Sequence, residues 1–498
     1  MALPEMALIY DLLGGTNFQH EGRAAQRPDL LECVDGSQNL ISDPAGEWVT
    51  RPGFSHVRAS AISGAPTITG MAHMKDVVDA FILATSAGKV YQDNASPPTE
   101  ITLGTAFTSG ATNLIRFAIH NDLLILASQS RDLPQTINAS LTGANLGGTP
   151  ARGLDVKSFF RRLCMFSPLY SSTTYPNRMS FTSANDDQTA WVAPIAVNSL
   201  RFGERAVLGG EVLGDFLFAF TADAVFRVYA TPNATLPLAI QQNVWVEDGG
   251  GPPSIHSVVN AAGRLWWPSR NGDLKVATDD GLVRSAKLST NVQPYLRGLA
   301  DAYRSLCVGG FEPQYRMICW GVAPSGQTTN QAMLVYHVDT GFAFVHTLAV
   351  QALAARGVGG DPRLLGGHYN GLFSNLYDSS TVGDLQTAAS TISAIARLPR
   401  LHHGQPGTKK KISYVGIEFD PISTETATVA ANYDDDTGFT DVSASVAISG
   451  TDTATARIKT PQPYDRLQLQ IRNAVANERM RVTRLGVPAP KATTVTAT

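Results

Sequence analysis

The chain has 498 residues, of which 43% are hydrophobic and only 16% are charged, and its formal net charge is −3. Soluble domains usually contain about 25% charged residues, so uncharged polar and small residues cover an unusual share of this surface. Proteins that grip nucleic acid usually show a strong basic excess. The composition therefore disfavours tight DNA binding, and the length allows two or three domains.

The cysteines and the first residues bear on the compartment. Four cysteines lie far apart without a CxxC pair, which predicts buried free thiols rather than a zinc site or a disulfide framework: Cys33, Cys164, Cys307 and Cys319. The first residues, MALPEMALIYDLLGG, include acidic side chains and no basic region, so no signal peptide is expected. No run of 18 apolar residues occurs, so no membrane span is expected. We expect a reduced protein that is made in the cytoplasm.

Residues 1–55 are mostly irregular in pattern and predict an extended N-terminal arm. The arm ends in the phrase Arg51-Pro52-Gly53. Proline and glycine in sequence are typical of turns. We therefore interpret this phrase as a structural turn that leads into the first folded unit.

A hairpin phrase recurs between residues 56 and 400. Its clearest copy, Leu213–Tyr229, reads LGDFLFAFTADAVFRVY, with two apolar runs around a polar break. β-branched and aromatic residues suit strands, and Gly, Asn and Asp suit tight turns. Successive copies start about 38 to 54 residues apart. The other copies are Ala80–Tyr91, Asn121–Ile137, Phe159–Phe181, Gly263–Val276, Gln314–Val338 and Arg363–Tyr377.

This period with four-strand content predicts an all-β protein whose main domain, residues 56–400, is a β-propeller of six or seven degenerate blades. Apolar positions at helical spacing predict one helical interruption over Pro294–Leu306. The pattern stops at residues 401–411, a predicted linker with a Lys409–Lys411 charge run. Residues 412–487 alternate again in six short runs, which predicts a small antiparallel β-sandwich. Residues 488–498 are expected to form a flexible tail.

The best candidate for site chemistry is an acidic turn in the sandwich. Asp434 and Asp436 precede Gly438 in a spacing that resembles the start of a calcium loop. No glutamate follows at the distance that a calcium loop needs, so metal binding is a weak candidate. The same spacing resembles an Asp box, a hairpin turn whose carboxylate holds backbone N–H groups. We interpret Asp436 and Gly438 as a structural turn.

Other polar motifs favour structural roles. Adjacent carboxylates at Asp186-Asp187 could suggest glycoside hydrolysis, but neighbouring strand residues point to opposite faces. His402-His403 lacks further ligands at metal spacing, and Gly249–Pro252 lacks the Lys-Ser/Thr of a phosphate loop. Arg161-Arg162 and Lys409–Lys411 are interpreted as solvated faces or subunit contacts. We predict no catalytic residue and no cofactor.

The order of phrases along most of the chain, from about residue 14 to 487, resembles the tail nozzle of short-tailed bacteriophages, also described as the tail hub that stabilises packaged DNA. Phe342 and Phe344 stand where tryptophan is common in the family, and Asp441 stands where an aromatic residue is expected. The phrases that carry the resemblance are Gly14–Asn17, Arg51–Phe54, Phe159–Phe166, Asn177–Asp187 with Trp191, Gly209–Val228, Gly249–Gly251, Arg264–Asp273, Asn330–Thr347, Asp436–Gly438, and Arg479 with Arg481.

The resemblance implies a structural virion protein and not an enzyme. Nozzle subunits form a ring, usually six-fold, below the portal and its adaptor, where tail fibre, spike or needle proteins also dock. Their propellers build the wall of a tube that retains packaged double-stranded DNA and later passes it into the host cell. A low-charge, slightly acidic protein suits a lumen through which DNA slides, because many Lys/Arg contacts to phosphates would hold the duplex.

Two alternatives belong to other classes. A propeller glycosidase would need carboxylates that converge on the propeller axis, with an arginine trio for an acidic sugar. A sugar-binding tail module would need aromatic residues repeated at equivalent blade positions, and the pair Trp266-Trp267 is not echoed elsewhere.

Overall fold

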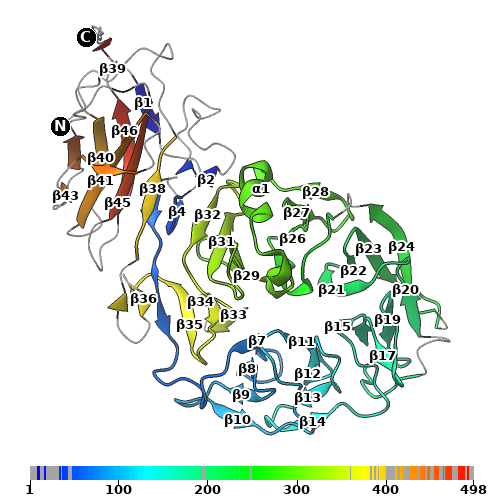
Figure 1. Ribbon diagram of the computed structural model, residues 1–498. Coiled ribbons are helices and arrows are strands. Elements are labelled where there is room, and N and C mark those ends of the chain that lie inside the picture. The colour runs from blue at the N-terminus through cyan, green and yellow to red at the C-terminus, as the bar shows by residue number, and fades with distance from the viewer. Residues whose placement is uncertain are drawn as a thin grey trace.

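The computed structural model is a ring of small sheets beside a two-sheet sandwich (Figure 1). It describes residues 36–399 except 43–46, 193–197, 235, 246–248, 359–360, 382–383, 386–388 and 391, together with 8–11, 16–17, 33–34, 410–411, 415–419, 425–434, 438–442, 446–448, 454–458, 464, 466–473, 480–487 and 491–492. In this part of the chain, no helix is long and apolar enough to cross a membrane.

Seven sheets follow one another around a common axis, so the predicted propeller fold is confirmed with seven blades. The first three blades are antiparallel and are built in chain order from the axis outward. Blade one contains β7 (Ile68–His73), β8 (Phe81–Thr85), β9 (Val90–Gln92) and β10 (Thr99–Ile101); blade two contains β11 (Ile115–His120), β12 (Leu123–Ser128), β13 (Gln135–Ile137) and β14 (Gly143–Asn145); blade three contains β15 (Asp155–Phe159), β16 (Arg162–Phe166), β19 (Arg178–Phe181) and β20 (Ser199–Arg201), with a side hairpin of β17 (Leu169–Tyr170) and β18 (Thr173–Thr174).

Blades four to six repeat the same plan. Blade four contains β21 (Val207–Leu213), β22 (Phe216–Thr221), β23 (Ala224–Ala230) and β24 (Leu238–Trp245); blade five contains β25 (Val259–Ala261), β26 (Arg264–Pro268), β27 (Leu274–Ala277) and β28 (Val283–Ser285); blade six contains β29 (Val308–Glu312), β30 (Met317–Val322), β31 (Ala332–His337) and β32 (Ala343–His346). A 3-10 turn, η1 (Ile255–Ser257), precedes blade five.

Each predicted hairpin phrase forms the second and third strands of a blade. The phrase Leu213–Tyr229 contains β22 and β23, and its polar break is closed by Thr221, whose Oγ1 accepts a hydrogen bond from the Ala224 amide at 2.9 Å. Neighbouring blades cover both faces of these strands, which explains their apolar sequence. Every residue of β8, β16 and β30 is buried. The phrase was detectable because burial on both faces leaves a long apolar run.

The predicted helix is found at a different position. α1 covers Ser289–Arg297, and a separate 3-10 turn, η2, covers Asp301–Leu306. The two are split at Gly298, the residue that caps α1. Glycine is the residue most common at helix ends, so the predicted single helix over Pro294–Leu306 is corrected to two short ones.

Blade seven joins the two ends of the domain. Its strands β33 (Ala352–Val358), β34 (Asp361–Gly367) and β35 (Phe373–Asp378) come from the end of the propeller sequence, and the next strand, β6 (Gly53–His56), comes from the predicted arm. The order continues through β36 (Asp384–Leu385) to β37 (Ala389–Ser390). Because β6 from the start of the chain pairs with β35 from the end of the propeller sequence, blade seven is completed by both ends of the domain, and the ring is closed.

The sandwich has two sheets, and it too uses the predicted arm. One sheet has the order β4 (Leu40–Ser42), β5 (Trp48–Thr50), β46 (Arg481–Val487), β40 (Val415–Phe419) and β44 (Ala454–Ile458), with β1 (Leu8–Asp11) beside β46. The other has the order β38 (Ile395–Arg397), β45 (Leu467–Asn473), β41 (Glu425–Tyr433) and β42 (Thr440–Asp441), with β43 (Val446–Ile448) beside β41. All six predicted sandwich runs are strands.

The predicted domain boundaries are corrected by these pairings. Strands β4 and β5 belong to the sandwich rather than to a free arm, and β38 belongs to the sandwich although it precedes the predicted linker. Within the predicted linker and tail, β39 (Lys410–Lys411) pairs with β47 (Lys491–Ala492), and within the predicted arm β2 (Thr16–Asn17) pairs with β3 (Cys33–Val34). Strands of only two residues carry no period that distinguishes them from loops.

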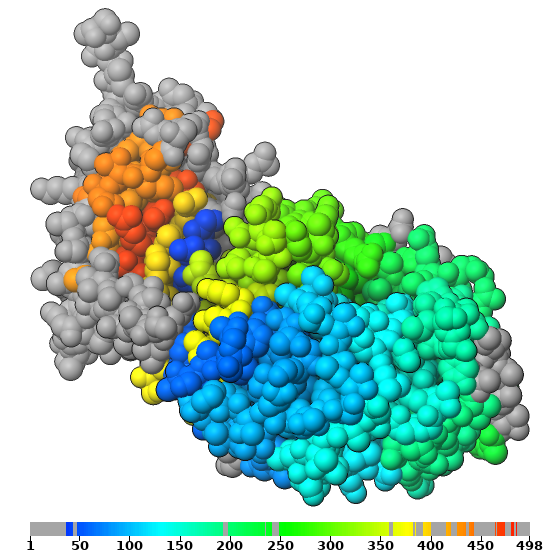
Figure 2. Space-filling model, turned by 60° about the horizontal axis from the view of Figure 1, so that its bottom comes forward, coloured from blue at the N-terminus to red at the C-terminus, as the bar shows by residue number. Residues whose placement is uncertain are grey.

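The propeller and the sandwich are also joined by side chains that pack in a common hydrophobic core. The sandwich core includes Trp48 from β5 together with Leu469 and Leu485 from its two sheets, and also Phe344 from β32 of blade six. Trp48 and Phe344 expose 0% and 2% of their surface. Figure 2 shows the sandwich lying against the propeller beside the yellow chain of blade seven. Burial of an aromatic side chain from one domain in the core of the other fixes their contact.

Candidate functional sites: the inter-domain joint and the propeller axis

The inter-domain joint is centred on Arg51, which links β5 of the sandwich to β6 of blade seven. Its guanidinium is 1% exposed and donates to both oxygens of Asp384, from Nη1 at 2.8 Å and from Nη2 at 2.5 Å. Asp384 lies on β36, which pairs in parallel with β6. A bidentate arginine–carboxylate pair is directional, so it fixes how the chain passes from sandwich to propeller.

Asn39 completes the joint from the sandwich side. Its Oδ1 accepts from Arg51 Nε at 3.0 Å and from the Thr347 amide at 2.9 Å, and its side-chain amide donates to the Ser393 carbonyl at 2.8 Å. Asn39 has a φ of 59°, a left-handed conformation that asparagine tolerates better than most residues. One side chain therefore ties blade six, the start of β38 and Arg51 together.

A histidine forms a second buried link across the joint. His346 Nε2 donates to the Leu40 carbonyl at 2.8 Å, so Nδ1 is the acceptor for the Tyr377 hydroxyl at 2.8 Å. Burial, with a smaller contribution from the charge of Arg51, lowers the pKa of His346 to about 3. The imidazole is therefore neutral at physiological pH, as the hydrogen bonds at both of its nitrogens require.

The Arg-Pro-Gly phrase thus has a larger role than the predicted turn. Residues Arg51 and Pro52 form no turn of their own; they run between β5 and β6, and Gly53 is the first residue of β6. The sequence singled out Arg51 but not its partners Asp384 and Asn39, which lie 333 and 12 residues away. No local pattern marks an ion-pair partner at such a separation.

A second cluster of charged side chains lies at the propeller axis on the innermost strands of blades two, three and four. Arg116 donates from Nε to Asp155 at 2.9 Å and from Nη2 to Glu211 at 3.1 Å, and Lys157 Nζ contacts Glu211 at 2.6 Å. Asp155 also accepts from the Gly210 amide at 2.8 Å. A side chain at Gly210 would place its Cβ 2.4 Å from the Phe166 ring, so glycine permits this approach.

The axial Glu211 is held in the charged form. Burial raises the pKa of Glu211, but Lys157 and Arg116 outweigh burial and hold the pKa below its usual value. The neighbouring His256 is neutral. Its burial has the largest effect, and the charges of Arg116 and Lys157 add to it, so that the pKa of His256 lies well below its usual value. The cluster therefore pairs two cations with two anions beside a neutral imidazole.

Arg116, Lys157 and His256 border a cavity of about 210 Å³ on the axis, which the innermost strands of blades one, two, six and seven also line. Two buried polar atoms at its wall, Thr69 Oγ1 and His256 Nε2, have no hydrogen-bond partner within the described chain. Its wall has a polar part, formed by Arg116, Lys157, Thr69 and His256, beside apolar residues such as Met71 and Phe117.

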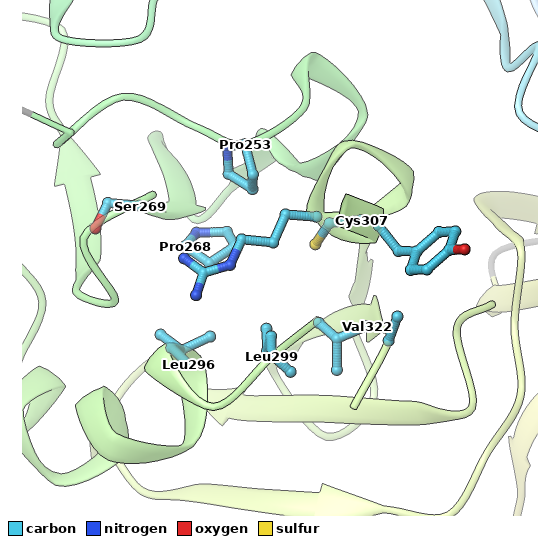
Figure 3. A pocket seen from close by; sticks show the side chains of 10 residues that line it. Pro253, Pro268, Ser269, Leu296, Leu299, Cys307 and Val322 are labelled. Atoms are coloured by element: carbon cyan, nitrogen blue, oxygen red, sulfur yellow. The ribbon is translucent and has the colours of Figure 1, made fainter. Parts of the chain in front are cut away.

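A smaller pocket lies beneath α1 and η2 (Figure 3). It measures about 10 Å³, which is room for about one water, and Leu296, Leu299 and Val322 line one side of it. Cys307 also lines it, and burial raises the pKa of this thiol to about 12. Cys164, Cys307 and Cys319 are free and buried, as predicted, while the side chain of Cys33 lies outside the described residues.

The acidic turn of the sandwich is partly described. Asp434 is exposed, has a φ of 54°, and accepts from the Arg466 amide through Oδ1 at 2.9 Å. Gly438 lies in a bend, and Asp436 lies outside the described residues. Among the residues described, no group of three or more His, Cys, Asp or Glu side chains could hold a metal ion. Asp434 lies in a turn that follows β41, and its contacts with Arg466 hold the end of the pairing between β41 and β45.

Replacing Asp434 by alanine is expected to lower the free energy of unfolding by about 1 kcal/mol, because the Arg466 amide loses its acceptor. Thermal unfolding with and without calcium measures this. Asp434→Asn, which keeps an oxygen acceptor, is the matched control and should retain most of the stability. A melting temperature that rises with calcium in the wild type alone would contradict the turn interpretation and support the metal site.

The remaining predicted motifs are separate from both clusters. Asp187 accepts from the Thr189 amide at 2.8 Å and hydroxyl at 2.7 Å in a local turn, and Asp186 pairs with Arg161 on the surface. Arg162 is buried and donates to the Thr182 carbonyl. Gly249 has a φ of 73° in a turn. His402-His403 and Lys409 lie outside the described residues.

Fold and sites together define a seven-bladed β-propeller that carries a β-sandwich built from both ends of the chain. No protein-family model matches the sequence, and no curated protein matches it. Among solved structures, BBS1N in complex with ARL6DN is similar at 15% identity over 66% of this chain and 99% of that one, with a TM-score of 0.43. YCF48 bound to a peptide is similar at 11% identity over 68% of this chain and 100% of that one, with a TM-score of 0.39.

Proposed function

We propose that this chain is the tail-nozzle subunit of a short-tailed bacteriophage. In this role it forms a homo-oligomeric ring, six-fold as in the family it resembles, below the portal adaptor of the virion. The ring retains packaged DNA, forms the channel for its ejection, and receives a fibre, spike or needle protein. The observation that carries the proposal is the buried joint at Arg51, which lies within one of the phrases that resemble the nozzle family.

A rigid joint suits a tube wall. Packaged DNA presses on the closed tail, and a wall made of two domains resists that load only if the domains move as one body. The pair of Arg51 with Asp384 and the insertion of Phe344 into the sandwich core supply such a connection. The formal net charge of −3 suits a lumen through which DNA slides rather than binds.

The axial carboxylates are the one observation that favours a propeller glycosidase instead. Glycoside hydrolysis needs a carboxylic acid that donates its proton, and such an acid has a raised pKa. The pKa of Glu211 is lowered, and both axial carboxylates are ion-paired. The cluster therefore supports a structural link among three blades better than it supports catalysis.

Mass photometry and electron microscopy of the purified chain, alone and mixed with its portal–adaptor complex, test the proposal. We expect a closed ring with about six times the 53.1 kDa mass of one chain, at least when the portal–adaptor complex is present. Lys89→Gln, which removes one charge of an exposed ion pair on blade one, serves as a preparation control. A persistent monomer without affinity for the portal–adaptor complex, or turnover of a glycoside, would contradict the proposal.

A further inference from the structure

The cavity on the propeller axis is lined by most of the ring. Its wall comes from β7, β11, β15, β29 and β33, the innermost strands of five blades, and from η1. Its volume of about 210 Å³ lies below the roughly 300–1,000 Å³ of pockets for drug-sized ligands. A ligand of this cavity is therefore a small molecule. Because one chain supplies the whole wall, binding there does not depend on the assembly of a ring.

The charges at the cavity are balanced. Of the described residues that line it, only Arg116 and Lys157 carry a charge. Arg116 pairs with Asp155 and Glu211, and Lys157 also pairs with Glu211, so two carboxylates outside the wall neutralise the two cations. A ligand with a net charge would bring an unpaired ion into this buried space, which is costly. We therefore expect a neutral ligand.

The hydrogen-bonding groups at the wall, in contrast, are not all used. Arg116 donates from Nε and Nη2, and within the described chain its Nη1 makes no hydrogen bond. Lys157 Nζ donates to Glu211 and carries two further N–H groups. Thr69 Oγ1 and His256 Nε2 have no partner among the described residues, although these residues are only 1% and 8% exposed. Buried polar groups are normally hydrogen-bonded, so the wall suits a partner that both accepts and donates.

The rest of the wall is apolar. Met71, Phe117, Val308 and Leu353 line it beside the polar groups. Water would satisfy the polar groups but gains nothing from apolar surface. A molecule that carries hydroxyl groups on a hydrocarbon ring matches both parts, because hydroxyl groups accept and donate hydrogen bonds and C–H surface packs against apolar side chains. Sugars have this character.

We propose that the axial cavity binds a small neutral molecule rich in hydroxyl groups, of the size of a single sugar unit. Hydroxyl oxygens of the ligand accept hydrogen bonds from Arg116 and Lys157. Thr69 and His256 each bond a further hydroxyl group, and Phe117 packs against the C–H surface of the ligand. The shared chemistry is the sugar unit itself, which is either a free monosaccharide or the end of a glycan chain.

Saturation-transfer NMR of the full chain tests this site. The probes are D-glucose, D-galactose, D-mannose and N-acetyl-D-glucosamine, with sodium acetate as the charged comparison. Thr69→Val and His256→Leu each remove a polar atom that has no partner among the described residues, so both variants should fold. Ser180→Ala is the matched control, because Ser180 Oγ in β19 is also buried without a partner there but does not line the cavity. Circular dichroism checks that all three variants fold.

We expect at least one of the four sugars to bind wild type and Ser180→Ala equally, and to bind Thr69→Val and His256→Leu at least about fivefold more weakly, the effect of one lost hydrogen bond. If the methyl glycoside of that sugar binds as well, the site accepts the end of a glycan; if it does not, the ligand is the free sugar. Binding of none of the four sugars, binding of acetate in their place, or binding that both cavity variants leave unchanged overturns the proposal.

Discussion

Replacing Arg51 by methionine is expected to lower the free energy of unfolding by about 3–5 kcal/mol, the usual cost of removing one partner of a buried ion pair. Methionine fills much of the same volume, so the loss comes from charge rather than from a cavity. The carboxylate of Asp384, with 11% of its side chain exposed, would stay buried without its cation. Asn39 would also lose the Nε donor that fixes its side chain.

Denaturant unfolding, followed by tryptophan fluorescence, measures this loss, because Trp48 lies in the sandwich core three residues before Arg51. Arg316→Met is the control, since the pair of Arg316 with Asp339 is about half exposed and exposed pairs contribute little. The double variant Arg51→Met with Asp384→Leu should recover part of the loss, because it leaves no unpaired charge. An Arg51→Met protein as stable as the control would show that the joint is not held by this pair.

Replacing Arg116 by methionine is expected to lower the stability of the propeller by about 3 kcal/mol or more. Arg116 joins Asp155, whose side chain is fully buried, to Glu211, which is 19% exposed. After the change Glu211 keeps Lys157, but Asp155 keeps only backbone N–H donors. We therefore expect most of the lost stability to come from Asp155, because its carboxylate is fully buried in blade three and water cannot replace its lost partner.

Hydrogen exchange measured by mass spectrometry localises the effect of Arg116→Met. We expect faster exchange in β11, β15 and β21, the three strands that the cluster joins, and unchanged exchange in the sandwich. Lys89→Met, at the exposed pair with Glu100 on blade one, is the matched control and should leave both unchanged. Uniform acceleration over both domains would show that the cluster does not act locally.

The blades are predictable from sequence because their information is local. In Leu213–Tyr229 both strands and the turn between them lie within one phrase, so apolar runs and turn residues reveal them together. The six sandwich strands that the sequence predicts are detectable from their own apolar alternation. The position of α1 is less predictable, because Pro294 lies inside the helix rather than at its start, where proline is usually found.

The joint and the axial cluster are not predictable in this way. β5 and β6 pair with strands that lie more than 300 residues later in the chain. The residues of the phrase WVTRPGF do not indicate which later strands these are. Arg116, Asp155 and Glu211 each look like an ordinary charge on an apolar strand. Only the ring arrangement brings them to one axis. Pro52 and Gly53 mark Arg51 as part of a predicted turn, whereas in the structure Arg51 is buried and pairs with Asp384.

Cryo-electron microscopy of the virion that contains this chain tests the central claim most directly. The proposal predicts density for seven-bladed propellers and their sandwiches in a six-fold ring around the tail axis, directly below the portal adaptor, with a lumen wide enough for duplex DNA. Absence of the chain from the tail, or its presence only in a peripheral fibre or spike that does not enclose DNA, would contradict it.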